Sequence, residues 1–376
     1  MFQTFDPASD RSFAAKHLPA MRAEMEAQGL DGFLVPHDDE YLNEYLPDNA
    51  ERLMWASGFS GSAGSAIVFL DTAVIFTDGR YTVQVREQVD DQFFAFEDLM
   101  ETPPHDWLAA NGKDGWRIGY DPMLHAPANV KQLQAAAKHA GFELVAVESN
   151  PIDAAWVGRP ESPATPVMVH PDEFAGRSSA DKRASIAAQL KAKKADAVLL
   201  TAPHSLAWLF NIRGKDVHAT PLPLGRALLF ADGTASLFVN PAKMSDEVRA
   251  HLGADVKDYP ETDVGDHLAK LGGTTVLLDP AIAPDWFRQQ LVDADAKVVE
   301  ERDPCSLPRA CKNAAEVEGS RQAHIRDGKA VSRFLHWIAT EAQDGTVTEI
   351  QAAQKLEEFR RQSNQLKDIS FDVPSG

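Results

Sequence analysis

The sequence predicts an α/β protein made of two tandem copies of one domain, followed by the first part of a third domain. Two observations predict this fold class. The same series of helix and strand patterns occurs twice, in the same order, within the first 305 residues. The remaining residues repeat neither copy and carry two helix patterns. A chain of 376 residues also exceeds the roughly 250 to 300 residues that one hydrophobic core supports, so more than one domain is expected.

Each copy begins with a helix that is followed by a buried strand. Residues 22–36 show a short helix pattern that ends near Gly29, and then the apolar run FLV. Glycine readily adopts the left-handed conformation that ends many helices. Residues 183–201 repeat this order, with Ile186 and Leu190 on one helix face and VLL as the strand.

Each copy continues with a tryptophan segment, a strand pair, and a helix between two further strands. Trp55 opens the segment WASGFSG and Trp208 opens WLFNIRG, and two alternating strand patterns follow each segment. The next strand of each copy ends in Asp-Pro, because proline cannot donate a hydrogen bond to a neighbouring strand. The shared order favours a true internal duplication. The remaining matches are residues 117–134 with 275–291, and residues 142–153 with 296–305.

Proline-rich segments separate the three parts of the chain. Residues 149–167 hold several prolines, which block helices and interior strands and are typical of a linker. Residues 300–313 form a second joint. The expected parts are a first domain over residues 1–155, a second over 165–304, and a fragment of a third over 305–376.

The third segment predicts two helices and one short strand. Asn313 with Glu316 is typical of a capping box at a helix start, and Thr346 with Glu349 suggests a second one. A lone strand, ISFDV, follows the second helix, and one strand cannot form a sheet. We therefore expect the body of the third domain to lie beyond Gly376. The helices are expected over residues 314–342 and up to about 364, with apolar stripes at Val331, Leu335 and Ile338 and at Ala352, Leu356 and Phe359.

Composition argues against two classes of partner. The formal net charge of −19 repels nucleic acid and anionic lipid, because binding either needs clustered Lys and Arg. No apolar run approaches the roughly 20 residues of a membrane helix, so no membrane contact is expected. The two cysteines, Cys305 and Cys311, are compatible with a reducing compartment, and we expect a cytoplasmic protein.

Common catalytic motifs are absent from the sequence. No histidine is followed by glutamate, which excludes the His-Glu-x-x-His signature of zinc peptidases. Cys305 and Cys311 are too far apart for a Cys-x-x-Cys pair, so small apolar roles are favoured over zinc binding. The segment GFSGSAG, residues 58–64, lacks the second glycine of a nucleophile elbow and predicts a tight connection between Trp55 and the next strand.

The segment TDGRY, residues 77–81, is the strongest candidate for a binding role. Its Asp-Gly pair ends the strand AVIFT, and Arg80 then projects from the following turn. Such an arginine could reach a carboxylate or a peptide carbonyl. The alternative is an ion pair with Asp78 inside the domain. Core or structural roles are the simplest interpretation of Trp55, Trp208, His204 and His218.

These segments together resemble a known family. Residues 53–81, LMWASGFSGSAGSAIVFLDTAVIFTDGRY, are similar to the first domain of the three-domain Xaa-Pro aminopeptidases, also called aminopeptidase P, of the creatinase/prolidase superfamily. Residues 207–230 resemble its second domain, and residues 312–338 the entry helix of its pita-bread catalytic domain. The segments VTEIQAAQKLEEFRRQ and DISFDVPSG resemble that domain's next helix and first strand. The resemblance implies two creatinase-N-terminal-like α/β domains and an incomplete pita-bread domain.

The resemblance implies a metallopeptidase. Members remove the first residue of peptides with proline in second position, and use two Mn²⁺-type ions held by Asp, Asp, His, Glu and Glu. In that family the ligands lie beyond the strand at which this chain ends. The resemblance therefore assigns no catalytic and no metal-binding residue here, and the chain alone is expected to be inactive. Asp368 and Asp372 do not match the ligand positions.

The resemblance also implies contacts with substrate and with a second subunit. Arg80 matches a family arginine that points from the first domain toward the catalytic cleft, so it is the candidate substrate-binding residue. Trp55 is a weaker candidate for the same role. The usual assembly of the family is a homodimer. Two other functions stay open: a non-catalytic scaffold, dimerisation or peptide-binding module of this fold, and a related dipeptidase or creatinase.

Overall fold

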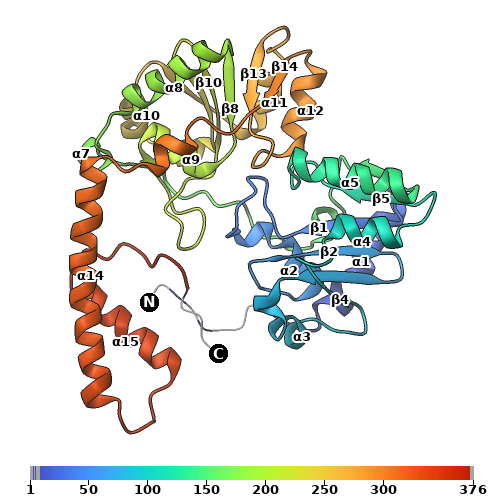
Figure 1. The fold of residues 1–376 in the computed structure, drawn as a ribbon, viewed down its shortest axis with the longest axis horizontal. Helices are drawn as coiled ribbons and strands as arrows, with labels where there is room; N and C mark the ends of the chain where they lie inside the picture. The colour runs from blue at the N-terminus through green and yellow to red at the C-terminus, as the bar shows by residue number, and fades with distance from the viewer. Residues whose placement is uncertain (1–2, 4, 6–8, 373–376) are drawn as a thin grey trace.

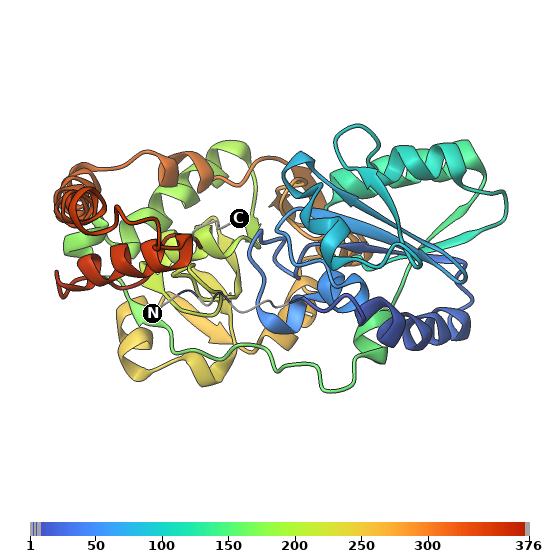
Figure 2. The same cartoon turned by 90° about the horizontal axis from the view of Figure 1, so that it is seen from below.

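The computed structural model describes residues 3, 5 and 9–372, which form two α/β units and a pair of helices (Figure 1). We call elements α1 to α6 the first copy, β7 to β14 the second copy, and α14 with α15 the helical hairpin. Figures 1 and 2 show the copies side by side, with the hairpin extending from the side of the second copy.

The first copy is built on a six-stranded mixed sheet with the order β4-β3-β2-β1-β5-β6. The pairs β1 with β2 and β2 with β3 are antiparallel, and the other neighbours are parallel. Its strands are β1 (Gly32–Pro36), β2 (Gly64–Phe69), β3 (Ala73–Thr77), β4 (Ala95–Asp98), β5 (Arg117–Tyr120) and β6 (Glu143–Ala146). Its helices are α1 (Phe13–Ala27), α2 (Arg52–Ser57), α3 (Gln84–Gln88), α4 (Pro104–Asn111), α5 (Pro127–Ala140) and α6 (Pro151–Ala155).

Side chains of the central strands alternate between two cores, one on each face of this sheet. Phe33 and Val35 belong to the core that includes residues of α1 and α2. Leu34, between them, belongs to the core that includes residues of α4 and α5. Because both faces are covered, the central strands are continuous apolar runs rather than alternating ones.

The second copy repeats this sheet with the order β12-β11-β10-β8-β13-β14. Each neighbouring pair has the same parallel or antiparallel sense as its counterpart, so the predicted internal duplication is confirmed. Its sheet strands are β8 (Ala197–Leu200), β10 (Arg226–Phe230), β11 (Ala235–Phe238), β12 (Val256–Tyr259), β13 (Thr275–Leu278) and β14 (Lys297–Glu300), beside a small pair, β7 (Met168–Val169) and β9 (Ile212–Arg213). Its helices are α7 (Asp172–Ala175), α8 (Ser179–Lys193), α9 (Pro203–Phe210), α10 (Asp246–Leu252), α11 (Val264–Leu268) and α12 (Asp285–Asp293).

Equivalent helices of the two copies end on left-handed residues. Gly29, with φ 65°, follows α1, and Lys194, with φ 57°, follows α8. Gly58 ends α2 with φ 88°, and Asn211 ends α9 with φ 50°. Glycine and asparagine adopt this conformation readily, whereas a lysine pays about 1 kcal/mol for it.

The two copies meet through a reciprocal pair of backbone hydrogen bonds. The Ala128 N–H donates to the Pro280 carbonyl at 3.2 Å, and the Trp286 N–H donates to the Pro122 carbonyl at 2.9 Å. Ala128 and Trp286 are the second residues of the equivalent helices α5 and α12, and both prolines follow the aspartate after equivalent strands. The copies are therefore related by a pseudo-twofold axis, as in an isologous dimer.

A loop found in the first copy, residues 37–51, adds a second contact between the copies. Tyr41 lies in a buried cluster with Val217 of the second copy. The Tyr41 hydroxyl donates to the Glu261 carboxylate at 2.5 Å, and the Arg226 guanidinium lies 4.1 Å from the Tyr41 ring centre. The loop thus fills the space between the copies with both apolar and charged contacts.

The helical hairpin follows the second copy through the short helix α13. Its capping box of Asn313 and Glu316 is confirmed. The second capping box consists of Thr348 and Gln351, so the predicted start at Thr346 is wrong by two residues, because Thr346 bonds to the preceding turn instead. The three helices are α13 (Ser306–Ala310), α14 (Ala314–Glu341) and α15 (Glu349–Arg361).

The predicted strand ISFDV is not formed within the described part of the chain. Residues 369–372 have no regular structure, and residues 373–376 lie outside the described residues. A strand needs a neighbouring strand for its backbone hydrogen bonds, and none lies beside this segment among the described residues. The prediction of a strand here was therefore wrong for residues 369–372.

Much of the apolar surface of α14 is exposed. Leu335 is 59% exposed and Ile325 is 54% exposed, while Ala330 is buried. The two helices contact each other through the Lys355 ammonium, which lies 5.8 Å from the Trp337 ring centre. Among the described helices, none combines the length and the apolar character that crossing a membrane requires.

Candidate functional site

The TDGRY turn holds Arg80 in a fixed position at the surface of the first copy. After β3, the Asp78 carboxylate accepts a hydrogen bond from the Arg80 backbone N–H at 2.9 Å and so caps the 3₁₀ turn Gly79–Tyr81. The Arg80 Nη2 donates to the same carboxylate at 2.7 Å, and its Nε lies 3.1 Å from both carboxylate oxygens. The hydrogen bonds from Arg80 lower the pKa of Asp78. The alternative proposed from the sequence, an Arg80–Asp78 ion pair, is therefore present.

This ion pair leaves part of the Arg80 guanidinium free. The side chain is 62% exposed, and its Nη1 makes no hydrogen bond to the described residues. An arginine has five N–H donors, so the Nη1 donors can still bind a carboxylate or carbonyl from outside. The guanidinium also lies 5.1 Å from the Tyr81 ring centre, which restricts its motion.

Tyr81 connects this turn to the glycine-rich segment that follows α2. Its hydroxyl accepts from the Ser62 backbone N–H at 3.1 Å and lies 2.9 Å from the Ser62 hydroxyl. Its ring packs edge-on against Phe59 at 5.4 Å. A Cβ atom at Gly61 would lie 2.3 Å from the Phe59 ring, so this close approach requires glycine. The GFSGSAG segment is therefore a tight connection, as its sequence predicts.

Trp55 lies inside the first copy, 6% exposed. Its ring stacks on His17 with 4.5 Å between ring centres and on Trp156 with 5.7 Å. Among the described residues, no hydrogen bond or ring contact joins Trp55 to Arg80. The position is that of a core aromatic residue, and a direct substrate contact by Trp55 stays a prediction.

The other histidines and carboxylates noted in the sequence lie apart from Arg80. His218 Nε2 lies 2.9 Å from Asp372 Oδ1 at the surface of the second copy. Burial lowers the pKa of His204. Within residues 3, 5 and 9–372, no group of three or more His, Cys, Asp or Glu side chains could hold a metal ion. The described donor set therefore does not fit a resident metal, and no chemical step of this chain is derived through one.

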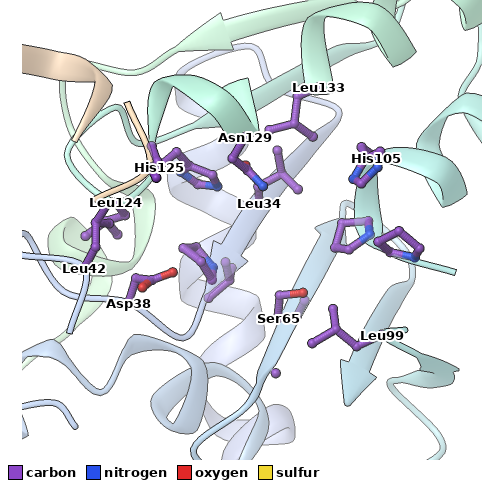
Figure 3. A pocket seen from close by; sticks show the side chains of 18 residues that line it. Leu34, Asp38, Leu42, Ser65, Leu99, His105, Leu124, His125, Asn129 and Leu133 are labelled. Atoms are coloured by element: carbon purple, nitrogen blue, oxygen red, sulfur yellow. The ribbon is translucent and has the colours of Figure 1, made fainter. Parts of the chain in front are cut away.

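A pocket of about 490 Å³ lies at the carboxyl edge of the first sheet. Its floor consists of the end of β1 and the start of the antiparallel β2, and its walls include the first turns of α4 and α5. Figure 3 shows Asp38 and Ser65 on one side of this space and His125 and Asn129 on the other. Ligands commonly bind at this edge of an α/β sheet. The full lining is Leu34, Val35, Pro36, Asp38, Leu42, Gly64, Ser65, Ala66, Leu99, Pro103, Pro104, His105, Leu124, His125, Ala126, Asn129, Leu133 and Ala281.

Burial changes the protonation of two side chains in this pocket. Desolvation, and then the nearby Asp39, raise the pKa of Asp38 from 3.8 to about 8. Desolvation lowers the pKa of His125 from 6.5 to about 4, although its Nδ1 lies 2.9 Å from the Asp121 carbonyl. At neutral pH both side chains are therefore mostly uncharged. Sequence reasoning missed this pocket, and its signal was the polar run HDDE directly after a buried strand.

Comparison with protein families identifies both copies. A family model described as "Creatinase/Prolidase N-terminal domain" matches residues 18–155, and a second model with the same description matches residues 158–316. Together the two matches cover more than half of the chain. The chain belongs to the creatinase/prolidase N-terminal domain family. The family assignment therefore agrees with the internal duplication seen in the two sheets.

Curated relatives of this creatinase/prolidase chain match it along nearly its whole length. It is 33% identical to the probable Xaa-Pro aminopeptidase P of Coccidioides posadasii, over 98% of this chain and 60% of the relative. It is also 33% identical to the probable Xaa-Pro aminopeptidase P of Sordaria macrospora, over 95% of this chain and 61% of the relative. The chain thus spans about 60% of the length of these relatives.

A solved structure shares the arrangement of the whole creatinase/prolidase chain. The X-prolyl aminopeptidase of Caenorhabditis elegans, described as a cytosolic enzyme with a di-nuclear active site, superimposes with a TM-score of 0.88 and 27% identity. The match covers 96% of this chain and 61% of that protein. The likeness therefore includes both copies and a partial further domain.

Proposed function

We propose that this chain is the N-terminal part of a metal-dependent aminopeptidase that removes the first residue of peptides with proline in second position. One observation carries the proposal: 33% identity over 98% of the chain to a relative named as a probable Xaa-Pro aminopeptidase P. The TM-score of 0.88 to an X-prolyl aminopeptidase supports it independently.

In this proposal the chemistry belongs to the whole protein. Two divalent metal ions, which we expect to be Mn²⁺, are held by residues that are not among those described here. When bound, such ions activate a water molecule and polarise the scissile carbonyl. This chain contributes position and charge rather than a metal ligand. A cytoplasmic location and a homodimer are further parts of the proposal, by analogy with the family.

Arg80 is our proposed substrate contact. Its guanidinium is exposed, is held in place by Asp78 and Tyr81, and keeps the Nη1 donors free. A planar guanidinium with free donors suits a peptide carboxylate or carbonyl. Trp55 is the weaker candidate for substrate contact; its side chain is buried, and it lies in α2, the helix that precedes the glycine-rich segment.

The domain limits are proposed as residues 1–155, 165–304 and 305–376. Residues 157–167 between the first two parts form neither helix nor strand, and Val157 in this segment is 96% exposed. The third part comprises α13, the helical hairpin and the irregular segment after it. Exposed, irregular chain of this kind is where domain boundaries fall.

The test compares this chain with the longest protein that its gene encodes. Both are supplied with Mn²⁺ and an X-Pro-Pro peptide, and release of the first residue is measured. We expect hydrolysis by the longer protein that is lost with a chelator, and none by this chain. Hydrolysis by neither, together with stable self-association of both, would support the scaffold or dimerisation module instead. Metal-dependent hydrolysis by this chain alone would contradict our placement of the active site.

A further inference from the structure

The pocket at the carboxyl edge of the first sheet is a feature of the first copy, not of the shared fold. In the first copy, residues 37–51 separate the end of β1 from the start of α2, and this loop supplies Asp38 and Leu42 to the pocket. In the second copy, only residues 201 and 202 separate the end of β8 from α9, which begins at Pro203. Leu42 also has a φ of 54°, a conformation that L-residues other than Asn and Asp rarely adopt. The loop therefore builds this pocket at some cost in backbone strain.

Two polar groups in the pocket have no partner among the residues that the structure describes. The carboxyl group of Asp38, a half-buried residue, makes no hydrogen bond or ion pair with the described residues. The Ser65 hydroxyl oxygen is buried and is also without a hydrogen-bond partner among them. Buried polar groups are almost always bonded, because leaving them unpaired costs free energy. The buried Ser65 hydroxyl oxygen and the half-buried Asp38 carboxyl group face one cavity, where a single ligand could bond to both.

The charges around the pocket select the kind of ligand. The lining contains no lysine and no arginine, and the Nε2 of its half-buried histidine, His105, lies 3.6 Å from the Asp106 carboxylate, so an anion finds little positive charge here. His125 is neutral at physiological pH because burial lowers its pKa. Asp38 is the one carboxylic acid in the lining, and it becomes negatively charged when it loses its proton. A metal ion is disfavoured, because these side chains do not form a group of three metal-binding donors.

Most of the other side chains that line the pocket are apolar. Leu34, Leu99 and Leu133 surround the space that Asp38 and Ser65 face in Figure 3. A cavity of about 490 Å³ has room for a ligand the size of a substituted benzene ring. The ligand must therefore combine an apolar body with one cationic hydrogen-bond donor.

We propose that this pocket binds a small primary amine with an apolar body, whose ammonium group donates to the Asp38 carboxylate and to the Ser65 hydroxyl oxygen. The apolar body packs against the leucine side chains of the lining. The proposal concerns the first copy alone and does not depend on the peptidase function proposed above.

Binding of an amine must displace a proton. Burial keeps Asp38 mostly protonated at pH 7, because its pKa is about 8. An ammonium ion pairs with the ionised carboxylate, so the carboxyl O–H bond breaks and about one proton per bound amine passes to the buffer. The other titratable groups near Asp38 are His37 and Asp39 along the chain and His105 and His125 across the pocket. Proton release that disappears when Asp38 is replaced comes from Asp38 and not from these other groups.

The test is calorimetric titration of this chain with 2-phenylethylamine at pH 7, in two buffers of different ionisation enthalpy. We expect saturable binding with release of about one proton, and at least tenfold weaker binding of 2-phenylethanol, which lacks the charge. Asp38→Asn should weaken amine binding at least tenfold and abolish proton release. Asp71→Asn, which removes an exposed carboxylate from the same copy, should bind like the original chain.

A second variant tests the location without changing the carboxyl group. Asn129 is exposed on the first turn of α5 and lines the pocket, so Asn129→Trp should block the space without disturbing a core. We expect it to lose amine binding while its circular dichroism and unfolding temperature are retained. The proposal is overturned if the alcohol binds as tightly as the amine, if the amine does not bind, or if Asp38→Asn or folded Asn129→Trp binds it normally.

Discussion

The imidazole of His17 lies parallel to the indole of Trp55, with 4.5 Å between the ring centres and 2° between the ring planes. Its Nδ1 also lies 2.5 Å from the Trp55 carbonyl oxygen. In the second copy, the Lys182 ammonium lies 4.8 Å from the Trp208 ring centre and donates to the Trp208 carbonyl at 3.0 Å. In each copy, a side chain of the first long helix, α1 or α8, therefore bonds to the tryptophan carbonyl near the end of the next helix, α2 or α9. The last carbonyls of a helix lack partners within the helix.

Replacing His17 by alanine should destabilise the chain. The variant loses the ring stack and the hydrogen bond, and the Trp55 carbonyl is left with one partner fewer. We expect the free energy of unfolding to fall by roughly 1 to 2 kcal/mol, measured by urea denaturation. His139→Ala, at an exposed position on α5, is the matched control and should change little. Equal stability of the two variants would contradict a structural role for the stack.

The duplicated fold could be predicted because each copy repeats local signals, such as a strand ended by Asp-Pro. The equivalence of His17 and Lys182 could not be predicted, because an imidazole ring and a lysine side chain differ in shape and length. The sequences of the two helices that contain them, α1 and α8, also share few identical residues. The structure relates Met25 to Leu190, since each carbonyl accepts from the N–H of the residue after the left-handed one, which is Leu30 in the first copy and Ala195 in the second. Such equivalence depends on backbone geometry that residue names do not encode.

The sequence predicted one part of the candidate site, Arg80, and missed another, the pocket around Asp38. The position of Arg80 after a strand follows from the Asp-Gly pair, and the structure places it there. The pocket around Asp38 was missed, because its lining comes from several segments between Leu34 and Ala281 that only the fold brings together. The late strand was predicted from its composition, but a strand depends on a neighbour that local sequence does not reveal.

Limited proteolysis should separate the two copies. Val157 is 96% exposed and Leu307 is 69% exposed, and both lie at the proposed domain limits. We expect elastase or chymotrypsin to cut near residues 155–165 and near 305, and mass spectrometry to find two resistant cores. The reciprocal bonds between Ala128 and Pro280 and between Trp286 and Pro122 should keep the cut copies associated on a sizing column. A single resistant core without internal cuts would count against these limits.

The buried Arg52 should be among the most sensitive positions of the first copy. It is 1% exposed, and its guanidinium pairs with Asp153 at 2.7 Å and with Glu40 at 2.5 Å. Arg52→Ala removes the buried partner that both carboxylates share and leaves Arg159, which lies 2.7 Å from Asp153, as the nearby cation, so we expect a loss of about 3 kcal/mol in the free energy of unfolding. Arg11→Ala, which removes an exposed pair with Asp91, should cost less than about 1 kcal/mol. Similar losses for both would show that the buried pair adds little.

Arg80→Ala should impair catalysis in the longer protein without unfolding it. If the free Nη1 donors bind the peptide, kcat/KM for an X-Pro-Pro peptide should fall about tenfold or more, because a charge-assisted hydrogen bond is lost. Arg80→Lys should recover part of this loss, since it keeps the charge but not the planar donors. Arg249→Ala is the control, because it removes a similar exposed pair with Asp258 in the second copy. An unchanged kcat/KM in Arg80→Ala would show that Arg80 does not contact the substrate and that its role is the ion pair with Asp78.

Asp38→Asn should make the chain more stable, and only at higher pH. Burial raises the pKa of Asp38 from 3.8 to about 8, so the folded chain holds this proton more tightly than the unfolded chain. The resulting stability is complete below about pH 4 and is lost as the pH rises to about 8. Asparagine stays neutral throughout, so the variant should gain roughly 1 to 3 kcal/mol at pH 8, with partial exposure of Asp38 reducing the full effect, and almost nothing at pH 4. Urea denaturation of both proteins at the two pH values measures this, with Asp71→Asn as the control. If the variant is less stable than the original chain at pH 8, the Asp38 carboxylate has a favourable partner within the protein. That result would contradict the inference that Asp38 binds the ammonium group of a ligand.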